Sequence, residues 1–386
     1  MTFVDKNRNR IQPFSLTRTS LAQYLVLTLV VLTCCQTTAS AQDDSPIPEW
    51  LQQRLVDRVL HRRDSNAMMR LMNPIAEKAE ASVVEVISGG RPVALGTVVS
   101  LNSSSDQLNT TTAPSSDPSV VQDAYIVTKR SELSGDPIRI RLADGRLIPA
   151  RVAAVRRRSD LALLVAQVDQ ATKVRSLQPV HFDRYVPLIG SFLISPDRTG
   201  RVIGLGVVGA APRKVSHKGR LGIELERISQ TGARVRNIIP DSGADEAGLE
   251  RGDRIIAIDG RNQNDVRQVV STLNGMFPGE VVQLTIERDG STVDIPARMG
   301  ELAVMQESEN DARVNGARNI RLSGFEQAIQ HDMVLNPEQC GGPVLDTEGR
   351  VIGLNIARAG RVVSYALPAS LVASEVSSMI AEAGGK

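Results

Sequence analysis

The stretch that decides the fold lies near the C-terminus and reads Leu335-Asn336-Pro337-Glu338-Gln339-Cys340-Gly341-Gly342-Pro343-Val344-Leu345-Asp346. Proline and a pair of glycines favour a tight loop around Cys340, and the aliphatic residues after it are typical of a strand. The runs Gly349 to Asn355 and Tyr365 to Pro368 continue this strand pattern. The C-terminal part of the chain is therefore predicted to be a loop followed by strands.

The same short strands and turns recur from Ala81 onward. The chain of 386 residues contains 30 Gly and 19 Pro but only 3% aromatic residues, which favours many turns and aliphatic cores. Asp144-Gly145 lies between two expected strands and predicts a β-hairpin. We therefore expect a globular, mostly β protein with two or three domains. The strands expected in this half are Ser82 to Ile87, Val93 to Leu101, Ala124 to Thr128, Ile138 to Leu142 and Leu147 to Val155.

Two segments near these strands have a different pattern. From Trp50 to Met72, apolar residues recur at helical spacing, which predicts a helix that breaks near Asn73-Pro74. This helix would either form an arm for contacts between subunits or pack on its own domain. Between Asn102 and Asp123, a stretch rich in Ser, Thr and Asp has no apolar periodicity and predicts a surface loop.

The first forty residues have the pattern of an export signal. Four basic residues precede an uncharged apolar run from Leu21 to Cys35, and Ala39-Ser40-Ala41 follows as a small-x-small cleavage site. We predict a signal peptide over residues 1–41, cleaved before Gln42, and hence a location in the periplasm or cell envelope. The alternative is an uncleaved membrane anchor, because the apolar run is close to anchor length. The basic residues are Lys6, Arg8, Arg10 and Arg18.

Cleavage changes what the charge and the cysteine content indicate. The whole chain has 45 basic and 43 acidic residues, and the cleaved chain has 41 and 42, so its net charge does not favour nucleic acid as a partner. Of the 3 cysteines only Cys340 remains, which excludes a disulfide within the mature chain. We expect Cys340 to be buried, reactive or paired with another chain.

The order of these runs resembles the trypsin-like serine proteases of the HtrA/Deg family. Five runs in the first half are similar to the first β-barrel of the family, and Leu335 to Asp346 is similar to its nucleophile loop. The resemblance implies a trypsin-like double β-barrel and a His-Asp-Ser triad. The five runs are Ser82 to Val86, Leu95 to Ser100, Tyr125 to Thr128, Leu142 to Arg146 and Ser159 to Leu164.

This resemblance assigns the triad positions to Ser131, Asp160 and Cys340. In the family, two residues separate the end of the Tyr-Ile-x-Thr-like strand from the catalytic histidine, and here Ser131 stands in that place. Asp160 is retained, whereas Cys340 replaces the nucleophilic serine. Hydrolysis needs an imidazole to take the proton of the nucleophile, and a thiol without a nearby imidazolium keeps an ordinary pKa.

The position that should supply an N–H to the oxyanion hole is also changed. The family has Gly-Asn before its serine, and this chain has Glu338-Gln339. A glutamate disfavours the backbone geometry of glycine and adds negative charge where negative charge develops. We therefore expect a protein without hydrolytic activity; the alternative is an active serine- or cysteine-dependent endopeptidase with an unrecognised base. The histidines are His61, His181, His217 and His331, none of them at the triad position.

A second resemblance covers Gly219 to Met299, which is similar to a bacterial PDZ domain. Ala247-Gly248-Leu249-Glu250-Arg251-Gly252-Asp253 is its most specific run, since these glycines end and turn a short helix before a buried strand that begins at Ile255. PDZ domains bind an extended peptide as an added strand and hold its terminal carboxylate with backbone N–H groups.

The peptide-binding residues follow from this second resemblance. The carboxylate loop would be Arg220 to Ile223, and the opposite wall a helix from Asp265 to Leu273, whose apolar residues at helical spacing are partly groove and partly core. The groove should favour aliphatic C-termini, because that face offers no partner to a buried polar side chain. The predicted peptide-binding residues are Arg220, Leu221, Gly222, Ile223, Val266 and Val270.

The PDZ-like segment lies inside the expected second barrel. Val202 to Ala211 and Asp332 to Leu367 are both assigned to that barrel, and the expected connections, Pro212 to Lys218 and Gly300 to Asn319, are polar. The expected divisions are a signal peptide (1–41), an N-terminal helical segment (42–78), the first part of the protease domain (79–217), the PDZ domain (218–300) and the second part of the protease domain (301–386).

The expected partners are the C-termini of exported or misfolded proteins, which this protein would bind in envelope protein quality control or as an adaptor. The family resemblance also implies a trimer. We expect no metal site, no small-molecule cofactor and no nucleic-acid partner.

Overall fold

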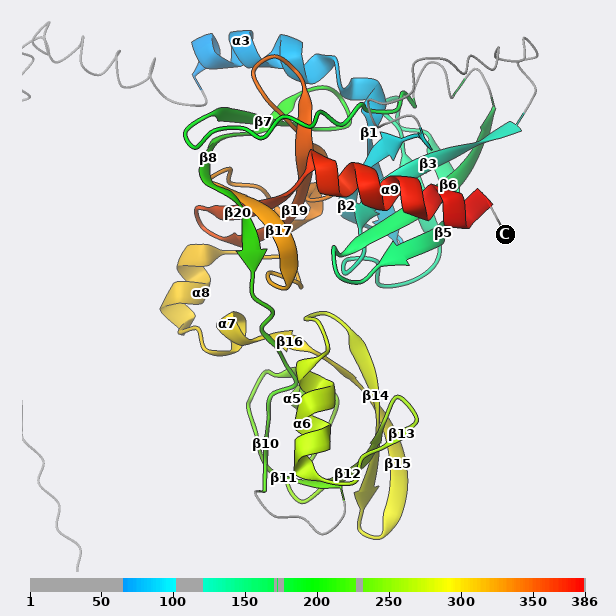
Figure 1. Ribbon diagram of the computed structural model, residues 1–386, viewed down its shortest axis with the longest axis vertical. Helices are drawn as coiled ribbons and strands as arrows, with labels where there is room; N and C mark the ends of the chain where they lie inside the picture. The colour runs from blue at the N-terminus through cyan, green and yellow to red at the C-terminus, as the bar shows by residue number, and fades with distance from the viewer. Residues whose placement is uncertain (1–64, 102–120, 170–171, 173–176, 227–231, 385–386) are drawn as a thin grey trace, which may run out of the picture. The chain divides into compact units, whose positions relative to one another are not determined.

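The computed structural model describes residues 65–101, 121–169, 172, 177–226 and 232–384 (Figure 1). The predicted signal peptide, the first part of the expected helix and most of the expected Ser/Thr/Asp-rich loop lie outside the described residues. Within the described part, the strands form two closed β-barrels, an open sheet and one short pair. The expected mostly β fold with a trypsin-like pair of barrels is confirmed.

The first barrel closes in the order β1-β2-β3-β6-β5-β4. Its apolar side chains point inward at every second position, as in β4, where Ile138 and Ile140 are buried and Arg139 is exposed. The predicted hairpin is confirmed, because β4 pairs with β5 and Gly145 adopts a φ of 87° in the turn. The strands are β1 Val83–Ser88, β2 Arg91–Val99, β3 Val121–Lys129, β4 Ile138–Arg141, β5 Leu147–Arg156 and β6 Leu161–Asp169.

The second barrel closes in the order β17-β20-β19-β18-β7-β8. Neighbouring strands β8 and β17 are far apart in the sequence, yet they pair with Val215 opposite Phe325. The barrel is therefore built from two separate parts of the chain. Its strands are β7 Phe192–Pro196, β8 Val202–Val215, β17 Phe325–His331, β18 Pro343–Leu345, β19 Val351–Gly360 and β20 Val363–Pro368.

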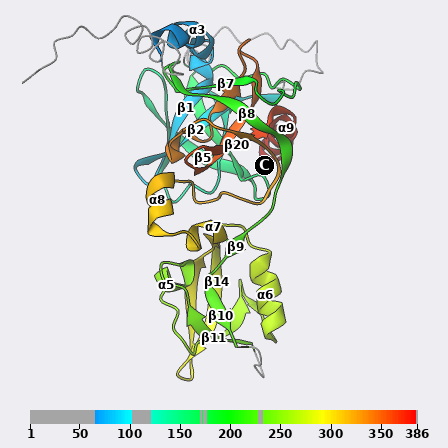
Figure 2. The same cartoon turned by 90° about the vertical axis from the view of Figure 1, so that its left-hand side faces the viewer.

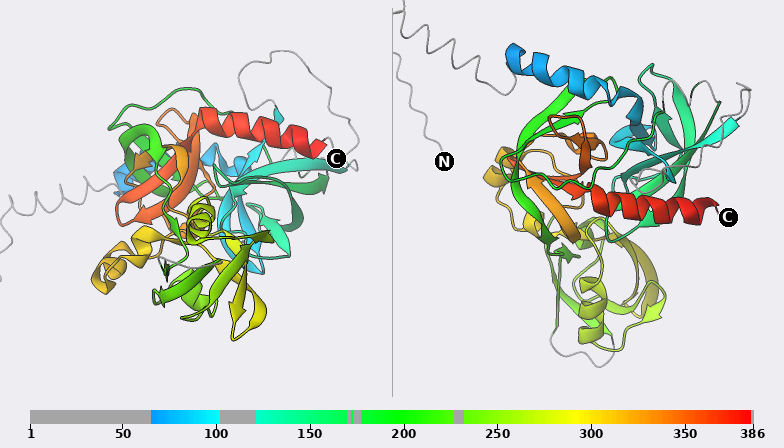
Figure 3. Two further views of the ribbon diagram at one scale, coloured as in Figure 1. Left: turned by 60° about the horizontal axis from the view of Figure 1, so that its bottom comes forward. Right: turned by 45° about the horizontal axis from the view of Figure 1, so that its top comes forward.

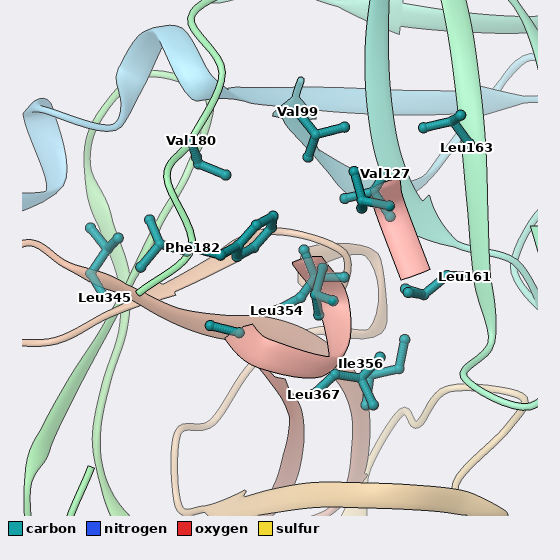
Figure 4. Packing of buried hydrophobic residues seen from close by; sticks show 14 of the residues in the cluster. Val99, Val127, Leu161, Leu163, Val180, Phe182, Leu345, Leu354, Ile356 and Leu367 are labelled. Atoms are coloured by element: carbon teal, nitrogen blue, oxygen red, sulfur yellow. The ribbon is translucent and has the colours of Figure 1, made fainter. Parts of the chain in front are cut away.

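A cluster of buried side chains joins the two barrels (Figure 4). In this cluster Val127 and Leu163 of the first barrel meet Leu354 and Leu367 of the second, and all four are fully buried. A fully buried aliphatic side chain contributes about 1.5–3 kcal/mol relative to an exposed one. The barrels are thus held together by a shared apolar core, and the loops between them are fixed against one another.

The chain between β8 and β17 forms the open sheet, in the order β10-β11-β12-β14-β15. Helix α6 (Val266–Asn274) lies beside this sheet and buries Val269 and Leu273 in its core (Figure 2). Gly248, after the short helix α5 (Gly243–Glu246), has a φ of 73°, which glycine adopts readily. The strands are β9 Gly219–Arg220, β10 Ile223–Leu225, β11 Ala233–Ile238, β12 Arg254–Ile258, β13 Arg261–Asn262, β14 Val281–Arg288, β15 Ser291–Arg298 and β16 Gly300–Glu301, with β16 paired to β9 and β13 to β12.

The predicted break of the N-terminal helix at Asn73-Pro74 is wrong. Helix α3 (Asn66–Glu77) is capped by Ser65 and continues through Pro74. Proline removes one backbone hydrogen bond within a helix. The burial of Met72 and Ala76 in the core between the barrels keeps the helix in place despite this loss.

The C-terminal helix α9 (Ala369–Gly384) packs against β5 and β19, so it touches both barrels (Figure 3). Its buried side chains include Val372, Val376 and Met379. In the part of the chain that the structure describes, no helix combines the length and apolar character needed to cross a membrane. The remaining helical segments are η1 Glu80–Ser82, α7 Leu302–Met305, α8 Glu309–Asn315 and η3 Pro337–Gln339.

Candidate active site and peptide groove

Ser131 and Asp160 are brought together by the pairing of β3 with β6. Lys129, the last residue of β3, lies opposite Leu161, the first residue of β6. Ser131 follows β3 and Asp160 precedes β6, so their side chains meet at one end of the first barrel. Asp160 has a left-handed backbone with a φ of 58°, a conformation that costs free energy in non-glycine residues.

The carboxylate of Asp160 is held by three donors and none is an imidazole. Its Oδ1 accepts the backbone N–H of Ser131 at 3.0 Å, and its Oδ2 accepts the Ser131 hydroxyl at 2.8 Å. The same Oδ2 accepts the ammonium of Lys129 at 2.6 Å, and both charged side chains are fully buried. Asp160 therefore forms a buried ion pair in place of the contact with histidine that a protease uses.

The described histidines lie elsewhere. His181 is exposed, and His331 is buried at the end of β17, where burial lowers its pKa to about 4. His217 stacks on Phe277 and accepts the N–H of Gly219 at 3.2 Å. Among the described residues, no hydrogen bond joins a histidine to Ser131, Asp160 or Cys340.

Cys340 is fully buried, and its thiol donates to Asn319 Oδ1 at 3.1 Å. Burial raises the pKa of the thiol to about 12, and the charge of Lys129 only partly opposes this shift. The thiolate is the nucleophilic form of cysteine. At neutral pH Cys340 is therefore a buried, protonated thiol, and it is already hydrogen-bonded to Asn319.

The backbone before Cys340 does not form an oxyanion hole. Residues Pro337–Gln339 form η3, a 3₁₀ turn, and the N–H of Cys340 donates to Pro337 O at 3.1 Å. Glu338 is exposed, and its neighbour Gln339 accepts the N–H of Asn336 at 2.7 Å through its side chain. An oxyanion hole needs the N–H of the nucleophile directed at the developing charge. Here that N–H is already used.

The segment that returns from the open sheet to β17 runs past these residues. Asn319 is buried and donates through Nδ2 to Glu132 at 2.9 Å and to Pro337 O at 3.1 Å. The ammonium of Lys129 donates to Arg321 O at 3.3 Å. Residues 319–321 therefore contact Lys129 and Glu132, on either side of Ser131, and also Pro337 in the loop before Cys340.

Arg321 is the largest fully buried side chain in this region. Its guanidinium donates to the carbonyl oxygens of Arg157, Arg158 at 2.7 Å and Gly324 at 2.6 Å. It also lies 4.0 Å from the ring centroid of Phe277. These contacts satisfy a buried charge with oxygen dipoles and an aromatic face.

The turn Phe277 to Glu280, which precedes β14, reaches the same place. A Cβ added to Gly279 would lie 3.5 Å from Ser131 Cβ and 2.8 Å from Ile320. Arg157 donates to both oxygens of Glu280, at 2.6 and 2.7 Å, and Glu280 is 5% exposed. Burial raises the pKa of Glu280, but the hydrogen bonds from Arg157 and from the Phe277 N–H outweigh it and hold the pKa below its ordinary value. The turn therefore contacts Ser131 and is anchored there.

The predicted peptide groove lies at the edge of the open sheet. β10 is an edge strand, and its partner is β11 on one side only. The preceding loop makes a tight turn at Gly222, whose φ is 90° and where an added Cβ would lie 2.2 Å from Ser242 Cβ. Leu221 is buried in the core, whereas Ile223 is only half-buried. Arg220 is exposed and donates to Gly219 O at 2.7 Å.

The helix opposite β10 divides its apolar residues between core and surface. Val269 and Leu273 are buried, Val266 packs on the edge of the core, and Val270 is 42% exposed. Val266 and Val270 line an open hollow of about 580 Å³ together with polar residues of the same helix. A strand added beside β10 would bring its side chains against half-buried Ile223 and against this helix.

Comparisons with known proteins found matches to a PDZ domain and to DegP-like serine endoproteases. A family model described as a PDZ domain matches residues 219–298. A probable periplasmic serine endoprotease, DegP-like, from Marinomonas sp. (strain MWYL1) is 24% identical over 324 residues, covering 62% of this chain and 67% of the relative. A DegP-like relative with the same description from Chlamydia trachomatis serovar D is 28% identical over 97 residues, covering 25% of this chain and 19% of the relative.

The chain carries a PDZ domain and is similar to DegP-like serine endoproteases. Similar solved structures include Rv3671c of Mycobacterium tuberculosis H37Rv in an inactive mutant form, 13% identical with a TM-score of 0.38 over 82% of this chain and 94% of that one. The serine endoprotease of Yersinia pestis is 16% identical, with a TM-score of 0.25 over 60% of this chain and 98% of that one.

The sequence did not point to Lys129, Asn319 and Arg321. The signal for Lys129 was present, because a lysine ends a strand that pairs beside Asp160. Asn319 was predicted to end a polar connection, but it is buried, with 3% of its surface exposed. The connection is also not a simple loop: Gly300–Glu301 pair with β9, and α7 and α8 follow.

Neither the sequence nor the described structure points to a metal centre. Within residues 65–101, 121–169, 172, 177–226 and 232–384, no group of three or more His, Cys, Asp or Glu side chains is arranged to hold a metal ion.

The buried Lys129–Asp160 pair gives a test of how the site is held. We expect Asp160→Asn to lower the free energy of unfolding by about 3–5 kcal/mol, because Lys129 loses its counter-charge inside the protein. The double variant Lys129→Met, Asp160→Asn should lose less than the single one, and urea denaturation measures both. Glu224→Gln, which breaks the exposed pair with Arg236, is the control and should have a much smaller effect. If the double variant lost as much unfolding free energy as the sum of the two single variants, Lys129→Met and Asp160→Asn, the pairing would be contradicted.

The burial of Cys340 predicts its reactivity. In a protein that starts at Gln42, Cys340 is the sole cysteine. With a pKa of about 12, only about one thiol in ten thousand is ionised at pH 8, against about a quarter at an ordinary pKa of 8.5. We expect iodoacetamide to leave the native protein unmodified and to alkylate it fully in guanidinium, as read by mass spectrometry. Rapid alkylation of the native protein at pH 8 would show that the thiol is accessible and ionised.

Proposed function

We propose that this protein binds polypeptides through its PDZ domain and does not cleave them. The observation that carries the proposal is the state of Cys340: its thiol is buried with a pKa raised to about 12 and is bonded to Asn319. A nucleophile must be ionised or have a base beside it to attack a peptide carbonyl. In the described residues neither condition is met.

Two further features support the absence of cleavage. The carboxylate that should orient an imidazole is paired with Lys129, whose ammonium is a donor and not a proton acceptor at this site. The N–H of Cys340 donates to Pro337 O rather than toward a substrate. Because base, nucleophile and oxyanion hole act as a unit, the loss of all three removes the reaction rather than slowing one step.

The PDZ groove supports the binding half of the proposal. β10 has one unpaired edge, and Gly222 shapes the loop that would hold a terminal carboxylate. Half-buried Ile223 and the helix residues Val266 and Val270 offer apolar contacts to an aliphatic last residue. We infer that free C-termini with aliphatic residues are the ligands, in the manner of an adaptor or a holding protein.

The location and assembly of the protein are part of the same proposal. The export pattern in residues 1–41 and the periplasmic description of the DegP-like relatives both support action in the cell envelope. There, exposed C-termini of exported or misfolded proteins are the ligands that we propose. A trimer, implied by the HtrA resemblance, is the assembly that we propose for testing by light scattering.

The peptide groove predicts a preference for a free carboxylate. A fluorescent peptide that ends in an aliphatic residue should bind with micromolar affinity, about −8 kcal/mol, and its C-terminal amide should bind much more weakly. Gly222→Ala should abolish the difference, because its methyl group collides with Ser242. Gly260→Ala is the matched control, since Gly260 also has a positive φ but nothing lies within 4 Å. Equal binding of acid and amide by the unmodified protein would exclude this mode.

The absence of cleavage is tested with unfolded casein. We expect no fragments from the unmodified protein, and none from Ser131→His or Cys340→Ser alone, because repair of one triad position leaves the others missing. Trypsin in a parallel reaction checks the assay. Cleavage by the unmodified protein that Cys340→Ala abolishes would establish the alternative, a cysteine-dependent endopeptidase, and would end the proposal.

A further inference from the structure

A second cavity lies where the chain leaves the second barrel toward the PDZ domain and where it returns. It has a volume of about 510 Å³, in the range of ordinary ligand pockets. Its walls come from the end of β8, from the two connections and from the hairpin between β19 and β20. None of its lining residues belongs to the triad positions or to the predicted peptide groove.

The rim of this cavity is basic, and its cations have no acidic partner among the described residues. Arg213, Lys214, Lys218 and Arg361 line it and are exposed to solvent. No acidic side chain lies within 4 Å of any of these four charges in the described part of the chain, and Arg213 donates to the amide oxygen of Gln330 at 2.7 Å. Four like charges around one hollow attract a ligand of opposite charge.

The sole acidic residue in the lining does not cancel this charge. Glu301 is 4% exposed and accepts hydrogen bonds from Leu322 N at 3.2 Å and from Ser323 Oγ at 2.9 Å. Its carboxylate is thus held by the returning connection, and of the four rim cations the charge of Lys218 acts on it. Burial also raises the pKa of Glu301, which disfavours its charged form.

Most of the remaining lining is apolar, and its polar members are Ser216, Asn315 and Ser323. Val362 is 59% exposed, and Val215, Val363 and Tyr365 are half-buried beside it. Tyr365 is the sole aromatic residue of the lining, and its ring lies 6.3 Å from that of Phe325. A ligand that fits must therefore combine several negative charges with an aliphatic side chain.

We propose that this cavity binds an acidic segment of a polypeptide, with aspartate or glutamate side chains at the basic rim and an aliphatic side chain against Val362 and Val363. An inorganic anion would leave the apolar wall uncovered, and a nucleic acid would find a single half-buried aromatic residue rather than a series of stacking platforms. The site is independent of the PDZ groove and goes beyond the function proposed above. It gives the protein a second contact with a bound chain, away from the C-terminus.

The test uses the mature protein and a fluorescein-labelled peptide of alternating acidic residues and leucine. Its C-terminus is amidated, so that carboxylate capture by the PDZ loop does not contribute. We expect binding by fluorescence anisotropy that weakens with salt. The variant Lys214→Gln, Lys218→Gln, Arg361→Gln should bind roughly five- to a hundredfold more weakly, since each of three exposed ion pairs is worth a few tenths to one kcal/mol. Gly222→Ala should bind as the unmodified protein does.

A matched variant separates this site from general charge attraction. Arg91, Arg139 and Arg151 are exposed on the first barrel, and their change to Gln removes the same charge elsewhere. This control variant should bind the acidic peptide with the affinity of the unmodified protein. Both triple variants should keep its midpoint of thermal unfolding. Equal weakening by the two triple variants would overturn the proposal. Equal binding of a peptide with Gln and Asn in place of its acidic residues would also overturn it. So would displacement of the labelled peptide by an oligonucleotide or by phosphate at a lower concentration of negative charges than the unlabelled acidic peptide needs.

Discussion

The ion pair between Lys129 and Asp160 is the contact on which the arrangement around it depends. Both side chains are fully buried, and their charged atoms are 2.6 Å apart. Two charges removed from water are stable inside a protein only while they stay paired and hydrogen-bonded. The pair therefore fixes the end of β3, the start of β6 and, through the Ser131 N–H and hydroxyl, the turn between them.

The same constraint extends to the returning segment. Lys129 also donates to Arg321 O, and Arg321 in turn binds the carbonyl oxygens of Arg157 and Arg158 just before Asp160. Two residues before Arg321, Asn319 donates a hydrogen bond to Glu132 and accepts one from the thiol of Cys340. The side chains of Lys129, Ser131 and Asp160 are thus joined by hydrogen bonds, as are those of Asn319 and Cys340. Hydrogen bonds of Lys129 and Asn319 connect the barrels to the segment that returns from the inserted domain.

The position of the insertion explains two surfaces that an ordinary loop would not create. The PDZ domain interrupts the barrel between β8 and β17, which still pair along their length. Its turn at Phe277 to Glu280 is anchored by Arg157 beside Ser131. On the other side, the two connections and the β19–β20 hairpin enclose the basic cavity. The inserted domain therefore packs a turn beside Ser131 and takes part in a basic cavity through its two connections, while the edge of β10 stays unpaired.

The sequence by itself predicted the strands and the PDZ domain, because these depend on local periodicity and on glycines such as Gly248. It also shows Ser131 and Cys340 at the positions that the resemblance assigns to the histidine and serine, because this assignment depends on residues at fixed spacings. The continuation of α3 through Pro74 was not predictable, because the burial of Met72 and Ala76 between the barrels overrides the local preference of proline. Only the tertiary structure decided that Asp160 pairs with Lys129, that Asn319 covers Cys340 and that Arg321 is buried. These contacts join residues far apart in the sequence, and their free energy depends on the exclusion of water by both barrels, which no local pattern encodes.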